Sequence, residues 1–320
     1  MKKRVTSTVL LLVLTLIVLL LSACAPAGAD PSGSTGGSSS SADPDSKPAP
    51  GSFVFTQENY PRMGGSLAAL PLGEAITASV LSLDRESASS LIVFEGSTTD
   101  NYNALVNGTF DILLAYEPSE EAKQYAKDAN FEWEMTPIGR DALVFIENQD
   151  NPVDSLTLDQ IKAIYRGEIT RWDEVGGNDA AIIPYQRNKD SGSQTLFDKL
   201  IHLGDDLMTP PADYIVGSMI GLLEVVADYD NAADALGYTV YYYLTNMETD
   251  KLSRSKILAV DGVQPSNETI GSGEYPLTND FYVVIPAGLP DDSPVRILYN
   301  WIASEQGREL VVRENYVPVD

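Results

Sequence analysis

Histidine and cysteine are nearly absent from this chain, because its 320 residues include one of each, His202 and Cys24. One cysteine cannot form an internal disulfide or a set of thiolate metal ligands. One histidine leaves no histidine-rich metal cluster, and the G-x-S-x-G turn of a serine hydrolase does not occur. His202 lies in the apolar stretch L-I-H-L, which indicates a structural or surface residue. We therefore expect no metal, no cofactor and no enzymatic activity, and a hydrolase is the less favoured alternative.

Basic residues are also scarce, with 21 Lys and Arg against 46 Asp and Glu and a formal net charge of −25. If Lys2, Lys3 and Arg4 are removed with a leader peptide, 18 basic residues remain against 46 acidic ones, and the net charge becomes −28. Nucleic acids and anionic membrane surfaces are therefore not expected as partners. An anionic ligand would need short-range donors, because the wider field repels it and is screened only beyond about 8–10 Å.

Long apolar runs are missing except near the N-terminus. There the run Val9–Leu21, broken only by Thr15, follows three basic residues and is shorter than the roughly 20 residues that span a bilayer. This pattern predicts a secretory signal peptide at residues 1–23. Its end, L-S-A-C, resembles a bacterial lipobox, which implies cleavage before Cys24 and a lipid on that residue. Residues 24–52, rich in Ser, Gly, Pro and Ala, are predicted to form a flexible tether.

The rest of the chain alternates between strand-like and helix-like segments, which predicts an α/β fold with mostly parallel sheets. Strands are expected at residues 91–94, 110–116, 142–146, 182–185, 237–244 and 281–285. Helices are expected to begin near residues 67, 101, 121, 157, 193, 218 and 295.

Three hydroxyl-rich turns lead into predicted helices, at residues 64–66, 95–99 and 191–193. The start of a helix exposes unpaired N–H groups and the positive end of the helix dipole, so it favours an anion. Arg187, just ahead of the third turn, is able to bind two oxygens at once. Each turn alone is explained by ordinary helix capping, but all three together favour one shared oxyanion site beyond the carboxyl ends of the strands.

One stretch of the chain resembles a known family. It carries Arg187 and the turn Ser191-Gly192-Ser193, with the strand start Leu236-Gly237-Tyr238 further on. This pattern resembles the phosphate-binding lipoprotein of bacterial phosphate ABC importers, from about Tyr60 to the C-terminus. The part of the pattern that reads Tyr-x-Gly-x-Ile-x-x-Trp looks structural. The other matching positions, this part included, are Leu158, Ile161, Ile164, Tyr165, Gly167, Ile169, Trp172, Val175, Gly176 and Gly177.

The resemblance implies a two-lobed periplasmic-binding-protein (Venus-flytrap, type II) fold. Lobe one would comprise residues 53–141 and 279–320, and lobe two residues 142–278, with hinges near Asp141 and Thr278. It also implies a monomeric solute-binding protein that captures inorganic phosphate and delivers it to an ABC permease. The lipid on Cys24 would anchor this protein to the outer face of the cell membrane.

The resemblance also implies which residues bind the ligand. Lobe two would contribute Arg187 and the turn Ser191, Gly192 and Ser193. Lobe one would contribute Ser66 with the Leu67 backbone, and Ser97 with Thr98. Glu117 would accept a hydrogen bond from protonated phosphate, which fully ionised sulfate cannot offer.

Three positions depart from the family pattern. Leu67 stands where the family usually has a hydroxyl residue, and Gly64 where it frequently has aspartate. Glu117 stands where the family typically has aspartate, whose side chain is shorter. Binding of another oxyanion, such as sulfate or molybdate, therefore stays open, and so does a surface sensor or adhesion module on the same fold. Arg62 and Arg140 lie near candidate loops and are interpreted as structural ion-pair formers.

Overall fold

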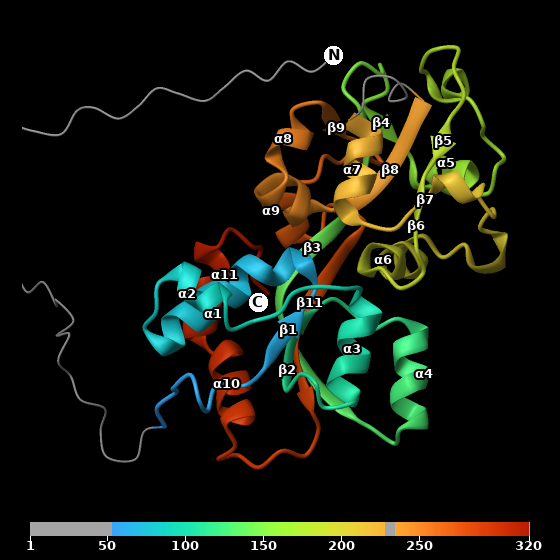
Figure 1. Cartoon of the computed structure of the whole chain (residues 1–320). Helices are drawn as coiled ribbons and strands as arrows, with labels where there is room; N and C mark the ends of the chain where they lie inside the picture. Colours follow the sequence, from blue (N-terminus) through green and yellow to red (C-terminus); the bar gives the residue numbers. More distant parts are fainter. Residues whose placement is uncertain (1–52, 228–233, 320) are drawn as a thin grey trace, which may run out of the picture. The chain divides into compact units, whose positions relative to one another are not determined.

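The computed structural model describes residues 53–227 and 234–319 of the chain (Figure 1). They belong to one compact unit, Phe53–Asp320. The predicted signal peptide, Cys24 and the predicted tether lie outside the described residues and remain predictions. Within the described ranges, no helix is both long and apolar enough to cross a bilayer.

Seven strands form the main sheet of the described part of the chain. Their order is β1 (Met63–Gly65), β2 (Ile112–Ala115), β11 (Thr278–Pro286), β3 (Trp133–Asn148), β8 (Ala235–Val240) and β5 (Ile183–Pro184), with β9 (Ser255–Ile257) also paired to β3. Two short parallel pairs lie apart: β4 (Ser155–Leu156) with β10 (Ala259–Val260), and β6 (Gln186–Arg187) with β7 (Ile215–Val216).

The main sheet is mixed, whereas the sequence predicted mostly parallel sheets. Only β1 with β2 and β5 with β8 run parallel among its described pairs; β11 and β3 are antiparallel to each other and to their remaining neighbours. The two strands that run against their neighbours are β11 and β3, and β3 is a 16-residue strand of which only residues 142–146 were predicted.

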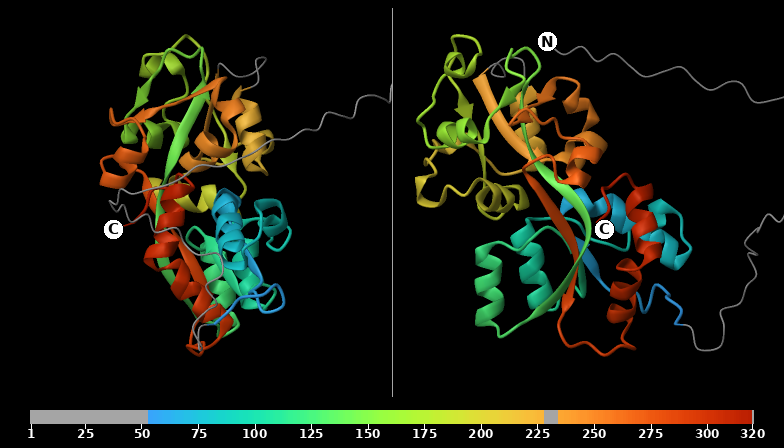
Figure 2. Two further views of the ribbon diagram at one scale, coloured as in Figure 1. Left: turned by 90° about the vertical axis from the view of Figure 1, so that its left-hand side faces the viewer. Right: turned by 180° about the vertical axis from the view of Figure 1, so that it is seen from behind.

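The strand β3 changes its partner midway along its length. Its residues Trp133–Ala142 pair with β11, and its residues Leu143–Glu147 pair with β8. Figure 2 shows β3 passing as one continuous strand between two groups of elements. The change of partner falls beside Asp141, where a hinge was predicted; the division into two lobes itself stays a prediction.

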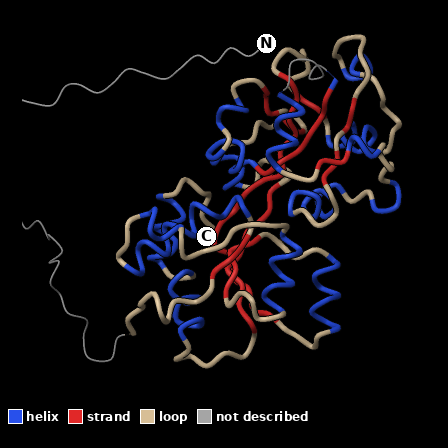
Figure 3. The backbone as a smooth tube through the Cα atoms, in the orientation of Figure 1, coloured by secondary structure: helices blue, strands red, loops and turns tan. Residues whose placement is uncertain are grey.

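Helices lie on both sides of the strands, as Figure 3 shows. Helices α3 and α4 lie on one side of β1, β2 and β11, and helices α1, α2, α10 and α11 lie on the other (Figure 1). The α-helices are α1 (Leu70–Leu81), α2 (Arg85–Ser89), α3 (Thr98–Val106), α4 (Glu120–Asp128), α5 (Leu158–Tyr165), α6 (Gly192–Ile201), α7 (Met219–Ala227), α8 (Thr249–Leu252), α9 (Asn267–Ser272), α10 (Pro294–Ile302) and α11 (Glu305–Arg313). Short 3₁₀-helices are η1 (Leu67–Ala69), η2 (Trp172–Val175), η3 (Gly204–Asp206) and η4 (Ala212–Tyr214), and η6 (Tyr243–Met247) is a π-helical turn.

Three predicted elements differ from the structure. The strand expected at residues 91–94 is not formed, because only Val93 pairs, through an isolated bridge to Gly64. The predicted strand at 237–244 ends at Val240, and helical turns follow it. There the backbone N–H of Tyr242 donates to the carboxylate of Asp141 (3.0 Å) instead of pairing with a strand. The predicted closing helix is two helices, because Ser304 begins α11 after α10 ends at Ile302.

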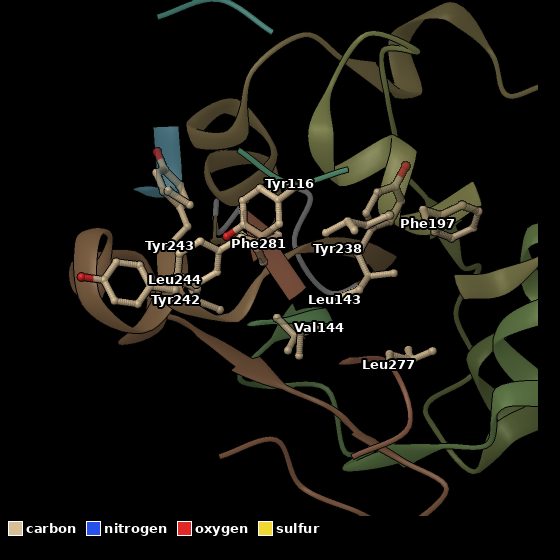
Figure 4. Packing of buried hydrophobic residues seen from close by; sticks show 14 of the residues in the cluster. Tyr116, Leu143, Val144, Phe197, Tyr238, Tyr242, Tyr243, Leu244, Leu277 and Phe281 are labelled. Carbon is tan, nitrogen blue, oxygen red and sulfur yellow. The ribbon is translucent and has the colours of Figure 1, made fainter. Parts of the chain in front are cut away.

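Aromatic side chains fill much of the core. Phe197 of α6 stacks on Tyr238 of β8 with ring centroids 4.7 Å apart (Figure 4), and Tyr165 meets Phe197 edge-on at the same distance. Tyr165, Trp172 and Tyr238 are fully buried, which confirms the structural role predicted for Tyr165 and Trp172. The stacked pair fixes α6 against the sheet, so the loop that starts α6 is held in place as well.

Candidate functional site

The predicted oxyanion loops meet at one cavity of about 410 Å³. Every predicted ligand residue except Glu117 lines this cavity. We call residues 187–193 and 217–219 the Arg187 side, and residues 66–68, 96–100 and Tyr116 the Ser66 side. The residues that line the cavity are 66–68, 96–98, 100, 116, 187, 188, 190–193, 217–219 and 240.

Each side presents helix starts to the cavity. On the Ser66 side, η1 begins at Leu67 and α3 begins at Thr98. On the Arg187 side, α6 begins at Gly192, where Ser191 caps it by accepting a hydrogen bond from the N–H of Gln194 (3.1 Å). First-turn N–H groups lack intrahelical acceptors, so they are available to an anion.

A further helix start at the cavity was not predicted as part of the site. Gly217, Ser218 and Met219 line it at the beginning of α7, and Ser218 caps this helix by accepting from the N–H of Gly221 (3.0 Å). The sequence shows Ser218 as a capping residue, and its Gly-Ser pair before an apolar helix is the same signal that marked the other loops.

Arg187 brings a buried positive charge to the cavity. The residue as a whole is 7% exposed. Its backbone N–H donates to the hydroxyl of Tyr238 (2.9 Å). Its Nε donates to the carbonyl of Val216 (2.9 Å), and its Nη2 is 3.4 Å from that of Gly217. In the described part of the chain no carboxylate pairs with it, and burial lowers the pKa of its guanidinium. Buried charges are normally paired, so this arrangement calls for an anionic partner.

Two polar side-chain atoms at the cavity are buried without a partner. They are the hydroxyl of Ser193 and the amide oxygen of Asn188, neither of which meets a hydrogen-bonding group among the described residues. Unsatisfied buried polar groups are rare and costly, so such atoms point to a missing ligand or water. Asn188 was not predicted, because nothing in the sequence R-N-K-D-S distinguishes its role.

The hydroxyls of the Ser66 side already have partners. Ser66 and Thr98 lie 3.2 Å apart through their hydroxyl oxygens, and the N–H of Tyr116 is 3.4 Å from that of Ser66. The Ser97 hydroxyl donates to the Asp100 carboxylate (2.7 Å) and accepts from the Asp100 N–H (3.0 Å). Ser97 therefore lines the cavity as predicted, but its hydroxyl is committed to capping α3.

Glu117 does not reach the cavity. Its carboxylate accepts from the ammonium of Lys199 (2.6 Å) and from the hydroxyl of Tyr282 (3.1 Å). The preceding residue, Tyr116, lines the cavity instead, and its hydroxyl donates to the buried carboxylate of Asp141 (2.6 Å). We therefore remove Glu117 from the ligand-binding set, and its predicted part as a proton acceptor is not supported.

The two sides touch across the cavity. The N–H of Thr99 donates to the carbonyl of Asp190 (3.3 Å), and Lys199 of α6 reaches Glu117 beyond β2. At Gly192 an added Cβ would lie 2.5 Å from the hydroxyl oxygen of Thr98, so a glycine is needed for this approach. Direct contacts thus join the two sides of the cavity.

Three side residues behave as the sequence suggested. Arg62 pairs with Asp111 (2.6 Å) and Arg140 pairs with Asp280 (3.1 Å), which confirms both as structural ion-pair formers. His202 is exposed and follows the end of α6, which confirms a surface residue.

Comparison with protein families and known sequences identifies the family of this chain and several relatives. A model described as a PBP superfamily domain matches residues 72–305. The phosphate-binding protein PstS of Borreliella burgdorferi is 24% identical over 270 residues, which are 82% of this chain and 91% of the relative. The phosphate-binding protein PstS of Bacillus subtilis is 28% identical over 216 residues, which are 67% of this chain and 66% of the relative.

Solved structures share the fold. A phosphate ABC transporter substrate-binding protein from Clostridium perfringens, solved with bound phosphate, gives a TM-score of 0.65 at 24% identity and covers 82% of this chain and 100% of its own. An ABC-type phosphate transport receptor from Vibrio cholerae gives a TM-score of 0.58 at 22% identity, with coverages of 80% and 98%. The predicted α/β periplasmic-binding-protein fold is therefore confirmed.

Proposed function

We propose that this chain, which belongs to the PBP superfamily, is an extracytoplasmic solute-binding protein that captures inorganic phosphate for an ABC permease. It is a substrate-binding protein and not an enzyme. The observation that carries the proposal is Arg187, a buried guanidinium that faces the cavity without a carboxylate partner in the described part of the chain. The phosphate-binding names of its relatives support the choice of anion.

The donors for this anion come from both sides of the cavity. The Arg187 guanidinium would supply the charge, and the free hydroxyl of Ser193 a neutral donor. The Ser191 hydroxyl accepts from Gln194, which leaves its own proton for the ligand. N–H groups at the starts of α3 and α6, at Thr98 and Gly192, complete the set. Such preorganised donors hold an anion despite the acidic net charge, because they act at hydrogen-bonding distance.

Release to the permease requires the cavity to open. We place the hinge at Asp141–Leu143 of β3, where the strand changes partner, and at Thr278, where β11 begins. Residues 53–141 with 279–320 and residues 142–278 would then move as two lobes. Delivery at the membrane would use the lipid proposed on Cys24, which anchors a monomer to the outer face of the cell membrane.

The test is isothermal titration calorimetry with phosphate, sulfate and molybdate on the chain lacking residues 1–23 and carrying Cys24→Ser. We expect phosphate to bind with a dissociation constant in the micromolar range or below, and Arg187→Ala to weaken that binding by roughly 30-fold or more. Absence of phosphate binding to the unsubstituted chain would overturn the proposal.

A second candidate ligand is sulfate or molybdate, because Glu117 is committed to Lys199 and does not select a protonated anion. The unpartnered amide oxygen of Asn188 is an acceptor, so it would pair with a protonated oxyanion and not with a fully ionised one. Tighter binding of sulfate than of phosphate in the same titration would favour this second candidate.

A further inference from the structure

The cavity is larger than a bare tetrahedral oxyanion requires. Such an anion has five heavy atoms, and at the ~30 Å³ that a water molecule occupies it would take at most about 150 Å³. The cavity measures about 410 Å³. More than half of its volume therefore remains when the anion is held by Arg187 and the helix starts.

Apolar and aromatic side chains line part of this cavity, beside polar, charged and glycine residues. Leu67 and Ala68 come from η1 and its start, Met219 from the start of α7, Val240 from the end of β8, and Tyr116 from the segment after β2. Met219 lies two residues beyond Gly217, whose carbonyl is 3.4 Å from Nη2 of Arg187. Apolar side chains are thus present on both sides of the cavity, and on the Arg187 side one follows closely in the chain after the anion-binding groups. Sites for organic ligands combine apolar surface with converging polar groups, and this cavity offers both.

The charges at the cavity restrict what the rest of the ligand carries. Two aspartates, Asp100 and Asp190, line the cavity, and the whole chain has a net charge of −25. A second anionic group on the ligand would lie near these carboxylates, and no Lys or Arg other than Arg187 is among the described residues that line the cavity. An uncharged substituent meets no such repulsion and would pack against Met219, Val240 and Leu67.

We propose that the cavity takes a monosubstituted phosphorus oxyanion, a phosphonate or phosphate monoester with a short uncharged organic substituent. Its –PO₃ group would lie on Arg187, Ser193 and the helix starts, and its substituent would occupy the remaining volume beside Met219, Val240 and Leu67. This inference rests on the proposed anion site, and it names the class of ligand that fits the whole cavity.

The test compares four ligands by isothermal titration calorimetry on the chain without residues 1–23 and with Cys24→Ser. The ligands are phosphate, methylphosphonate, n-propylphosphonate and 3-phosphonopropionate, the last having a carboxylate at the end of its substituent. We expect n-propylphosphonate to bind at least as tightly as phosphate, with up to about fourfold gained for each buried methylene. The carboxylated analogue should bind at least tenfold more weakly than n-propylphosphonate.

A variant at Met219 separates a packed substituent from one that is only tolerated. Met219→Ala should lower the ratio of n-propylphosphonate affinity to phosphate affinity at least threefold. The matched control is Met208→Ala, a half-buried methionine that does not line the cavity, and it should leave this ratio unchanged.

The outcomes distinguish this inference from the proposed function. Phosphate binding with n-propylphosphonate more than threefold weaker overturns the inference and leaves the phosphate proposal standing. Failure of every phosphorus ligand to bind, by calorimetry and by thermal stabilisation, overturns both.

Discussion

The Arg187 side of the cavity holds buried polar groups that lack a partner or a counter-charge, whereas the hydroxyls of the Ser66 side are bonded within that side. Among the described residues the hydroxyl of Ser193 has no hydrogen-bond partner. The guanidinium of Arg187 donates to the carbonyls of Val216 and Gly217 but has no carboxylate within residues 53–227 and 234–319 to balance its charge. Ser66 and Thr98 instead contact each other, and the Ser97 hydroxyl is taken by Asp100. The Arg187 side therefore supplies the charge and the free donors, and the Ser66 side supplies helix starts and a closing surface.

The difference follows from how each side is built. The Arg187 side is mostly one continuous loop. Tyr238 holds this loop, because its hydroxyl accepts from the N–H of Arg187 (2.9 Å) and donates to the side chain of Gln194. The Ser66 side joins three segments that are distant in sequence, so part of its hydrogen-bonding capacity holds those segments together. Four predictions test this difference between the two sides.

The largest effect is expected for Arg187→Ala. Removing the charged partner of a buried anion costs about 2–5 kcal/mol, so phosphate affinity should fall roughly 30-fold to several thousand-fold. Calorimetry measures the loss. The control is Arg62→Ala, which removes an exposed guanidinium paired with Asp111 and should leave phosphate affinity unchanged. Equal losses in both variants would contradict a special role for the Arg187 side.

Two serines test the comparison directly. Ser193→Ala should weaken phosphate binding by at least tenfold, because a hydrogen bond to a charged group contributes about 1.5–3 kcal/mol. The unliganded variant should be no less stable, since the removed hydroxyl has no partner among the described residues. Ser97→Ala should instead lower the free energy of unfolding by about 1 kcal/mol through the lost helix cap, with affinity changed less than threefold. The reverse pattern would exchange the roles of the two sides.

A pH-dependent effect is expected at Asp141, which joins Tyr116 of the Ser66 side to the N–H of Tyr242. Burial raises the pKa of Asp141 from 3.8 to about 6, so folding favours its protonated form. Its contribution to the free energy of unfolding is therefore full below pH 4 and is lost as the pH rises to about 6. Asp141→Asn has no carboxyl to titrate, so it does not lose stability in this way. The free energy of unfolding of the variant, relative to that of the unsubstituted chain, should therefore rise by on the order of 2 kcal/mol between pH 4 and pH 6.

Denaturant titrations at pH 4, 5, 6 and 7 measure this trend. Asp84→Asn is the control, because the N–H of Ser87 lowers the pKa of the exposed Asp84 and reverses the sign. Stability differences for Asp141→Asn that stay constant across these pH values would refute the burial account.

The sequence predicted the Arg187 loop better than the Ser66 side, for a physical reason. Arg187, Ser191, Gly192 and Ser193 lie within seven consecutive residues before a helix, so local rules place them together. The α/β class was predictable because periodicity is also local. The long β3, which pairs with both β11 and β8, was not, since strand pairing depends on residues far apart in the chain.

The error at Glu117 has a related cause. Successive side chains of an extended segment point to opposite faces, so a shift of one residue replaces a cavity group by one that faces away. Tyr116 lines the cavity, and Glu117 meets Lys199, which is 82 positions later in the sequence. No residue near Glu117 in the sequence indicates that Lys199 is its partner.

The smallest effect is expected for Lys199→Met, which cuts the ion pair with Glu117 that joins the two sides without touching the cavity lining. The Lys199 side chain is 40% exposed, and pairs of this kind contribute only about 0.2–1 kcal/mol. Phosphate affinity should therefore fall at most about fivefold, mainly through faster release, because the contact helps to hold the sides together. Stopped-flow measurement of the dissociation rate checks this, with Lys123→Met, which breaks an exposed pair within α4, as the control. An unchanged dissociation rate would mean that the sides are held together by the ligand and the Thr99–Asp190 contact alone, and the Ser66 side would then contribute shape but no closing energy of its own.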